Sequence, residues 1–378
     1  MTNTRPRRSR TRVDTVFVDF YDYTNVGDDL LFLTLAQRYP DVRFRFVGDK
    51  SDGATFAGLP NVRRLRRIPY LDGVLRRLRI PLRVNDLRRD LLVRRSPLVV
   101  RLGGSLYMER GDWRRNVERD TALLGSRGGT FFLNGNFGPW HSPEFLATYE
   151  RIFSRAADVT VRDTASLEQL RAVPQVRLAP DMLFAVPTGE RPGTQRGVVV
   201  SLVDLSGREG LDQHRDAYEA AMAELVNDLV TRRGDQVTLV SFCPLEGDEA
   251  AIDRVLDSLP EAARASVSAH RYRGDMAAML DVLRRAETVV ATRFHAMVLG
   301  LAFGSRVICV EYSNKVSNAL ADLGAADHGW KLEEFVASPR AERYQRVNDV
   351  QRLPVPGLAE RALEHFAVLD RYLTGTSG

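Results

Sequence analysis

Short apolar segments alternate with longer amphipathic segments along most of this chain, and that alternation constrains its fold more than any other feature. In the first half, the segments with the length and apolar content of β-strands are residues 13–20, 42–47, 98–102, 130–133 and 159–161. The segments with helical periodicity are residues 28–37, 143–156 and 164–171. Strands joined through helices pair in parallel, because each crossover helix returns the chain to the same edge of the sheet. The first half is therefore predicted to form an α/β lobe.

The same alternation starts again after a polar stretch that contains Pro187, Gly189, Pro192, Gly193 and Gly197. Beyond this stretch, the predicted strands are residues 198–203, 236–242, 267–270, 288–291 and 306–310. The predicted helices are residues 212–232, 248–259, 276–285, 296–303 and about 315–323. Proline and glycine in a polar segment indicate a linker, and 378 residues exceed what one hydrophobic core usually serves.

We therefore predict two Rossmann-like lobes that face a central cleft, followed by a C-terminal helix. The predicted bounds are 13–186 for the first lobe, 187–197 for the linker, 198–335 for the second lobe and 336–378 for a helical tail. Residues 324–358, which include the end of the second lobe, are expected to be irregular. The terminal helix is expected at residues 359–373. Among glycosyltransferases this architecture is called GT-B, and the architecture alone assigns no function.

Composition and missing motifs narrow the classes of function. No apolar run is long enough to span a bilayer, and residues 1–12 lack the apolar core of a signal peptide, so we expect a cytoplasmic protein. Cys243 and Cys309 lie in apolar, strand-like runs and are expected to be buried free thiols. The sequence contains no histidine or cysteine spacing typical of a metal site, no Gly-Lys-Ser/Thr phosphate loop and no dinucleotide fingerprint. We expect neither a metal nor a bound cofactor.

Positive charge is concentrated in residues 63–95. This region contains twelve arginines and three aspartates, a net charge of +9, against +5 for the whole chain. It has few aromatic residues and matches no nucleic-acid module, so nucleic acid is not an expected partner. Peripheral contact with the inner face of a membrane, contact with a phosphorylated carrier, and a simple solvated face all fit this composition.

Small and amide-bearing residues follow several predicted strands of the first lobe. Asn25, Gly27 and Asp28 follow the first strand, and the later positions are Gly103, Gly104, Asn134 and Asn136. Because ligands of open α/β sheets bind beyond the carboxyl ends of the strands, these residues are expected to line the cleft. Amide and backbone groups suit a hydroxyl-rich ligand, while an ordinary helix cap or turn remains the alternative for each motif.

Charged residues follow other strands in the same way. Arg162 and Asp163 end one strand of the first lobe, where an ion pair is the alternative to a ligand site, and Asp181 is expected to support an arginine or a loop. Arg293-Phe294-His295 separates an apolar strand from an apolar helix. The arginine can bind a carboxylate or phosphate and the histidine can carry a proton. Lys315 is a candidate point charge for an anion, or else an exposed residue at a helix start.

Taken in order along the chain, these motifs resemble the polysaccharide pyruvyl transferase family. The resemblance runs from about residue 16 to residue 323. It rests on residues 25–29, Gly103-Gly104-Ser105, residues 134–139, residues 161–163 with Ser166 and Leu167, Pro180-Asp181, residues 292–296, Tyr312 and Lys315. The sequence departs from the family pattern at Ser105, where a third glycine is common, and at Thr292, which replaces a frequent serine.

The resemblance implies an enzyme that transfers pyruvate from phosphoenolpyruvate onto a sugar as a cyclic ketal and releases phosphate, usually in the assembly of cell-surface polysaccharide. It implies that His295 is the general acid and that Arg162 and Arg293 bind phosphoenolpyruvate, with Phe294 and Lys315 beside them. The second lobe would then hold phosphoenolpyruvate, and the first lobe would hold the sugar acceptor. Nucleotide-linked, lipid-linked and polymeric acceptors all stay open. Two alternatives stay open, a GT-B glycosyltransferase that uses a nucleotide sugar and a non-catalytic glycan-binding protein.

Overall fold

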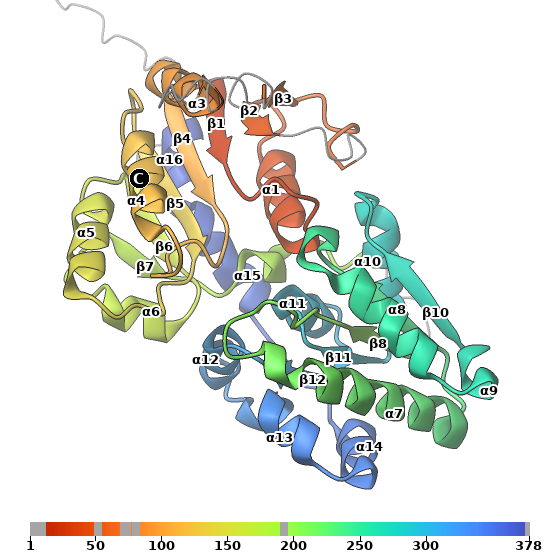
Figure 1. Cartoon of the computed structure of the whole chain (residues 1–378). Helices are drawn as coiled ribbons and strands as arrows, with labels where there is room; N and C mark the ends of the chain where they lie inside the picture. The colour runs from red at the N-terminus through yellow and green to blue at the C-terminus, as the bar shows by residue number, and fades with distance from the viewer. Residues whose placement is uncertain (1–12, 49–54, 69–76, 78–83, 190–195, 375–378) are drawn as a thin grey trace, which may run out of the picture.

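Two parallel β-sheets organise the chain, one in each half (Figure 1). The computed structural model describes residues 13–48, 55–68, 77, 84–189 and 196–374. The first sheet has the strand order β3-β2-β1-β4-β5-β6-β7. Its strands are β1 (Thr15–Asp19), β2 (Arg43–Gly48), β3 (Val62–Arg66), β4 (Leu98–Leu102), β5 (Thr130–Gly135), β6 (Asp158–Val161) and β7 (Val176–Leu178).

The second sheet repeats this winding with the order β10-β9-β8-β11-β12-β13. Its strands are β8 (Val198–Ser201), β9 (Val237–Ser241), β10 (Val267–Arg271), β11 (Thr288–Ala291), β12 (Arg306–Glu311) and β13 (Gly329–Lys331). In both sheets the direction of the strand order reverses at the first strand of the lobe. β4 lies beside β1 in the first sheet, and β11 lies beside β8 in the second. Such a reversal point opens a crevice at the carboxyl ends of the strands. The predicted fold class, two Rossmann-like lobes with a C-terminal helix, is confirmed.

The strands are apolar on both faces because helices cover both faces of each sheet. In the first lobe, Val16 and Val18 of β1 join one buried cluster, while Phe17 between them joins another with Val99. The second lobe alternates in the same way between two clusters. Burial on both faces explains why these strands appear in the sequence as continuous apolar runs rather than as an alternation of polar and apolar residues.

Helices connect the strands in each lobe. Those of the first lobe are α1 (Val26–Arg38), α3 (Val84–Arg95), α4 (Trp113–Leu123), α5 (Pro143–Phe153), α6 (Thr164–Gln169) and the 3₁₀ turn η1 (Met182–Ala185). Those of the second lobe are η2 (Asp212–His214), α7 (Arg215–Arg233), η3 (Pro244–Glu246), α8 (Asp248–Ser258), α9 (Glu261–Arg264), α10 (Met276–Arg285), α11 (Phe294–Ala302), α12 (Asn314–Asp322), η4 (Ala326–His328), α13 (Leu332–Ala337) and α14 (Arg340–Asp349). The last elements are α15 (Leu358–Ala362), η5 (Leu363–Phe366) and α16 (Ala367–Thr374).

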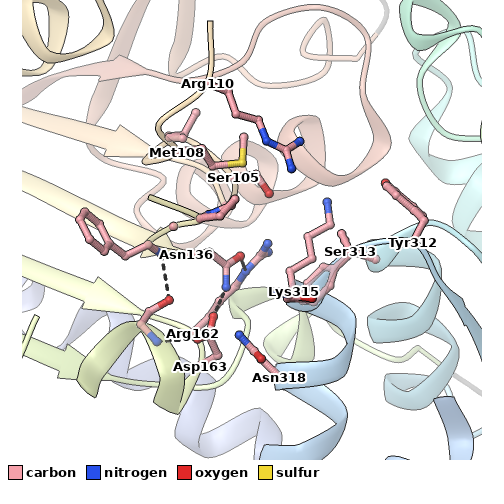
Figure 2. A pocket seen from close by; sticks show the side chains of 18 of the residues that line it. Ser105, Met108, Arg110, Asn136, Arg162, Asp163, Tyr312, Ser313, Lys315 and Asn318 are labelled. Atoms are coloured by element: carbon pink, nitrogen blue, oxygen red, sulfur yellow. Dashed lines mark hydrogen bonds between the residues drawn. The ribbon is translucent and has the colours of Figure 1, made fainter. Parts of the chain in front are cut away.

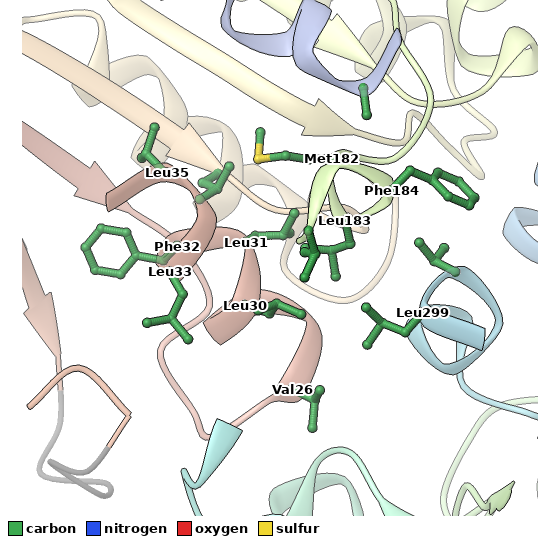
Figure 3. Close-up of a cluster of buried hydrophobic side chains, with 14 of the residues drawn as sticks. Val26, Leu30, Leu31, Phe32, Leu33, Leu35, Met182, Leu183, Phe184 and Leu299 are labelled. Carbon is green, nitrogen blue, oxygen red and sulfur yellow. The ribbon is translucent and has the colours of Figure 1, made fainter. Parts of the chain in front are cut away.

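One buried cluster runs through both lobes. Figure 3 shows Leu31 of α1 and Leu299 of α11 on either side of Leu183 in η1. Polar contacts join the same region: the amide of Val26 donates to the carbonyl of Phe242 at 3.0 Å. The hydroxyl of Tyr272 donates to Asp29 at 2.8 Å. These contacts hold the start of α1 against the second lobe.

The C-terminal segment returns to the first lobe. Asp370 of α16 accepts hydrogen bonds from Tyr39 at 2.7 Å and from Arg38 at 2.8 Å. The ring of Tyr372 lies edge-on to Phe131 of β5. The predicted helical tail is therefore divided between the lobes, because α14 packs on α7 of the second lobe while α15 packs on η1.

Residues 324–358 correct the sequence prediction, which left this region irregular. They contain η4, β13, α13 and α14. These elements are short, and α14 is rich in charge with only Arg343 and Val347 buried, so no apolar periodicity marks them. The prediction also lacked β3, α3, α4 and β7, of which β3 and β7 are the edge strands of their sheet.

Some predictions fall partly outside the described residues. In the arginine-rich 63–95 region, residues 69–76 and 78–83 lie outside the described residues. In the predicted 187–197 linker, residues 190–195 do so. Cys243 and Cys309 are both buried and free, as predicted.

Candidate active site

A cavity of about 660 Å³ lies at the carboxyl ends of both sheets. The loops after β1, β4, β5 and β6 line it from the first lobe, and those after β9, β11 and β12 line it from the second. Ser105, Met108 and Arg110 approach it from one side and Tyr312, Ser313 and Lys315 from the other (Figure 2). Its position matches the crevice expected from the two reversal points.

Three side chains from both lobes meet at the cavity, where Arg162 and His295 line it and Asp181 lies behind them. Nη1 of Arg162 lies 2.6 Å from Oδ2 of Asp181 and 3.2 Å from Nε2 of His295. The same Asp181 oxygen lies 3.8 Å from Nε2 of His295. Nε of Arg162 donates to Oδ1 of Asn136 at 2.6 Å, so the guanidinium is held on two edges. The cluster joins residues that are 133 positions apart in the sequence.

Burial and neighbouring charge act on this cluster in opposite directions. Burial raises the pKa of Asp181, but the charge of Arg162 and hydrogen bonds to the carboxylate outweigh it and hold the pKa far below its usual range. Burial lowers the pKa of His295, and Asp181 only partly offsets that effect while Arg162 and Lys315 add to it. The imidazole therefore favours its neutral form at pH 7. An anion bound beside it would favour the protonated form.

His295 packs against the backbone of Gly27 at the start of α1. A Cβ on Gly27 would overlap Nδ1 of the imidazole ring. Gly104 has the same relation to Arg162, because a Cβ there would overlap the guanidinium. The absence of a side chain at these two glycines of the first lobe therefore leaves room for the imidazole of His295 and the guanidinium of Arg162.

Arg293 lines the cavity, but its guanidinium is occupied by two carboxylates. It pairs with Asp248 and with Glu246. Burial raises the pKa of Glu246, but the charges of Arg293 and Arg208 outweigh it and bring that pKa to about 2. Asp248 also accepts hydrogen bonds from the amides of Phe242 and Cys243, both at 2.9 Å. Arg293 thus fixes the loop after β9, and its charge is neutralised.

Lys315 differs from Arg293 in that no carboxylate of the described chain pairs with it. Figure 2 shows its side chain directed into the cavity. Its Nζ lies 5.9 Å from the ring centres of both Phe294 and Tyr312. Burial raises the pKa of Tyr312, but the charges of Lys315, Arg293 and Arg208 outweigh it and the pKa falls below its usual range. This wall of the cavity is therefore electropositive.

Two helices begin at this wall without a side-chain cap. Neither Arg293 before α11 nor Ser313 before α12 accepts a capping hydrogen bond from the first turn of its helix. By contrast, Asn25 caps α1 and Asp163 caps α6. Uncapped N–H groups at a helix start, with the helix dipole behind them, favour an anion.

The remaining predicted residues divide into those that line the cavity and those behind its wall. Asn25, Asp28, Gly104 and Asn136 line it. Asn134 does not, because its side chain is buried and binds Asp181 at 3.1 Å and the amide of Met182 at 2.8 Å. Gly27, Gly103 and Asp181 also lie behind the lining. Asp163 is a lining residue whose carboxylate binds Asn136 and caps α6.

Three charged residues of the cavity, Arg110, Arg208 and Glu246, are not among the predicted site residues. Arg110 and Arg208 lie in loops, and Glu246 lies in η3. Glu246 comes shortly after β9, so a search of the residues beyond each predicted strand end could have found it. Arg110 and Arg208 carried no such signal, because their loops are longer and their positions depend on how these loops fold.

Solved structures of similar fold include two complexes with UDP. The Anabaena protein Alr3699/HepE, solved with UDP and glucose, superposes with a TM-score of 0.55 at 14% identity, covering 96% of this chain and 98% of that one. The UDP complex of S. aureus MnaA superposes with a TM-score of 0.58 at 8% identity, covering 96% and 98%. At these identities the likeness concerns the fold, which is GT-B-like.

Sequence comparison is more specific. The amylovoran biosynthesis protein AmsJ of Erwinia amylovora is 20% identical over 302 residues, which is 73% of this chain and 71% of AmsJ. A sequence profile of one family matches residues 25–314, a span that begins at Asn25 and ends beside Lys315, and so takes in both walls of the cavity. The chain therefore belongs to the polysaccharide pyruvyl transferase family.

Proposed function

We propose that this protein transfers pyruvate from phosphoenolpyruvate onto a sugar of a cell-surface polysaccharide or its precursor, forming a cyclic ketal and releasing phosphate. The family supports a transferase that acts on polysaccharide. The observation that carries the finer proposal is the convergence of His295, Arg162 and Lys315 on one cavity. There a residue that can carry a proton lies close enough to two cations for both to act on its pKa.

The charges of the cavity suit the donor. Phosphoenolpyruvate carries a carboxylate and a phosphate, so it needs positive groups at more than one point. Lys315 has no carboxylate partner in the described chain, and the starts of α11 and α12 offer uncapped N–H groups. Asp248 and Glu246 neutralise the charge of Arg293, so its proposed role is to hold the loop after β9 beside the start of α11.

The proton chemistry follows from His295. The anionic donor raises the pKa of the imidazole, which burial otherwise lowers, so binding itself prepares the acid. His295 then protonates the methylene carbon of phosphoenolpyruvate, and a sugar hydroxyl attacks the adjacent carbon. Phosphate leaves with the electrons of its C–O bond, and a second hydroxyl of the same sugar closes the ketal.

The acceptor would enter from the first lobe. Asn25 and Asn136 line the cavity there and offer amide groups to hydroxyls. A nucleotide-linked and a lipid-linked sugar are both compatible with a cavity that is open to the surface between the lobes.

A second function is favoured by one observation. The structures of HepE and MnaA that share this fold were solved with UDP, and the electropositive wall near Lys315 would also suit a diphosphate. The alternative is therefore a glycosyltransferase that uses a nucleotide sugar. A glycan-binding protein without activity is the third class.

A turnover assay separates these classes. The protein is incubated with phosphoenolpyruvate and a panel of free, nucleotide-linked and lipid-linked sugars, and phosphate and the acceptor mass are measured. We expect phosphate release together with a pyruvate ketal on one acceptor class, and loss of both with His295→Ala. Release of a nucleoside diphosphate from a nucleotide sugar would instead support the glycosyltransferase. Saccharide binding that survives His295→Ala, without any release, would support the binding protein.

We also propose peripheral contact with an anionic membrane surface through the arginine-rich 63–95 region. On α3, Leu87 and Leu91 are one turn apart and are 52% and 48% exposed. Arg94 and Arg95 are exposed beside them. Leucines surrounded by arginines fit the boundary between lipid headgroups and acyl chains. No helix of the described chain has the length and apolar content needed to cross a membrane.

Vesicle sedimentation tests this contact. We expect binding to vesicles that contain anionic lipid, weaker binding at high salt, and a loss with the double substitution Leu87→Ser, Leu91→Ser. Leu245→Ser is the matched control, because Leu245 is 67% exposed but lies in η3 of the second lobe. Equal sedimentation of all three proteins would contradict the proposal.

A further inference from the structure

Asp28 differs from the other carboxylates that line the cavity in the described chain. Glu246 is paired with Arg293 and Arg208, and Asp163 is bound to Asn136 and to the first turn of α6. Glu209 is exposed to solvent. Asp28 is partly buried, and its carboxylate has no hydrogen-bond or ion-pair partner in the described chain. The fold therefore holds an uncommitted carboxylate inside the cleft.

The position of Asp28 is fixed from several sides. Its amide donates to Oδ1 of Asn25 at 3.4 Å, within the cap of α1. Its Oδ1 lies against the loop after β4, 3.3 Å from where a Cβ on Gly103 would stand. The preceding residue, Gly27, packs against the imidazole of His295. The start of α1 thus brings Asp28 and the proposed acid to the same part of the cavity.

We propose that Asp28 is the catalytic base that removes the proton from the attacking hydroxyl of the acceptor sugar. This assignment rests on the proposed function. The hydroxyl must lose its proton as its oxygen bonds to the central carbon of the pyruvyl group. Phosphate is still bonded to that carbon at this step, so a carboxylate of the cleft is needed to accept the proton.

Atoms and charges balance with this assignment. His295 gives a proton to the methylene carbon, and the first hydroxyl gives its proton to the Asp28 carboxylate while its oxygen forms the new C–O bond. Phosphate leaves with the electron pair of its own C–O bond as the second hydroxyl attacks. The two hydroxyl protons replace the one delivered to the methyl group and supply the one carried away by hydrogen phosphate. The acid and the base are then restored by exchange with solvent.

The surroundings give Asp28 the strength that a base needs. Burial is the largest effect and raises its pKa to about 7, and the negative charge of Glu246 adds to this, while Arg162, Lys315 and Arg101 partly offset it. Asp29, next to it, carries a raised pKa as well and binds Tyr272 rather than the cavity. Tyr21 also lines the cavity, near enough to Asp28 for the negative charge of Asp28 to act on the phenol. A base with a pKa near the working pH is the most effective, because it is both ionised and able to hold a proton.

The test compares Asp28→Asn and Asp28→Glu with the wild type. Phosphoenolpyruvate binding is measured by calorimetry, and kcat and kcat/KM are measured from pH 5 to pH 9. Glu118→Gln is the control, since Glu118 is an exposed carboxylate on α4, outside the cavity. Thermal melting of each variant shows that it is folded.

We expect Asp28→Asn to bind phosphoenolpyruvate within about threefold of the wild type but to lose about 10²–10⁴-fold in kcat, as is typical when a general base is removed. The fall in wild-type activity below about pH 7 should be absent from its residual activity. Asp28→Glu should recover part of the rate with the acidic limb restored. A role confined to structure would not change the pH profile in this way.

The outcomes that overturn the assignment are distinct from those that overturn the function. If the wild type forms a ketal and Asp28→Asn retains more than about a third of kcat with the acidic limb unchanged, Asp28 is not the base. If the wild type forms no ketal from phosphoenolpyruvate with any acceptor, the proposed function fails and the assignment fails with it.

Discussion

His295 depends on residues that no stretch of sequence around it contains. Its strand-end position and its arginine neighbour are visible in the sequence, and they were sufficient to select it. Its contacts with Arg162 and Asp181 come from the other lobe, 3.2 Å and 3.8 Å away, and its packing against Gly27 comes from the start of the first helix. Sequence alone also suggested that Arg293 binds the donor directly, but it could not show that Asp248 and Glu246 already neutralise it. The position of a residue after a predicted strand indicates that it lies at the cleft, whereas only the tertiary structure shows which side chains it contacts.

The substitution Gly27→Ala, which adds one methyl group, tests whether the position of His295 depends on its packing against Gly27. Alanine has the higher helix propensity by about 1 kcal/mol, so helix propensity alone predicts no loss of stability. The new Cβ would overlap His295 and force the imidazole to move. We expect kcat to fall by about 100-fold, since small displacements of catalytic groups have costs of that order. Steady-state kinetics and a thermal melt measure the two effects separately.

Gly58→Ala is the matched control for this substitution. A Cβ on Gly58 meets no atom within 4 Å, so the same chemical change should leave turnover as it is. Wild-type turnover by Gly27→Ala would contradict the placement of His295 against α1.

The helices and strands differ in how well their own sequence predicts them. Strands β1, β4, β8 and β11 are buried on both faces, and their apolar runs predict them to within a few residues. The edge strand β3 has only partly buried or exposed residues, three of them arginine, and gives no such run. The return of α15, η5 and α16 to the first lobe depends on contacts with residues more than a hundred positions away, as between Asp370 and Tyr39. No periodicity encodes contacts of that kind.

The stability of the packing of η5 against the first lobe depends on pH through His365. Its ring nitrogens contact Oγ1 of Thr160 at 2.7 Å and the carbonyl of Pro180 at 2.9 Å, and the side chain is fully buried. Burial lowers its pKa to about 4. The unfolded chain, with an ordinary histidine pKa, therefore binds more protons than the folded chain between about pH 6.5 and pH 4. Stability from this group is complete above that range and decreases as the pH falls through it.

Denaturant unfolding of the wild type and His365→Gln across this range measures the effect. The difference in unfolding free energy between the two should shrink by about 3 kcal/mol from pH 7 to pH 4, because the variant has no group to protonate there. His214→Gln, which changes a partly exposed histidine in η2, should follow the wild type. A difference that stays constant with pH would contradict a buried neutral His365.

At the scale of the whole molecule, the two lobes form one working unit. A continuous apolar cluster passes from α1 through η1 to α11, and the amide of Val26 bonds the carbonyl of Phe242 across the boundary. The first lobe supplies Arg162 and Asp28 to the cavity and Asp181 behind it, and the second supplies His295 and Lys315. The lobe order and the cleft follow from the alternation of strands and helices, which is why they could be predicted. The donor identity rests on the family and on the charges gathered where the lobes meet.

Turnover in D₂O tests the central claim, that a protonated His295 delivers a solvent-derived proton to phosphoenolpyruvate as the pyruvyl group is transferred. The product is analysed by NMR of the ketal methyl group, and phosphate is counted in the same reaction. We predict one deuterium in each methyl group and one phosphate for each ketal, because the imidazole exchanges its proton with solvent before each turnover. A ketal with an undeuterated methyl group, or phosphate release that leaves no ketal on the sugar, would contradict the account.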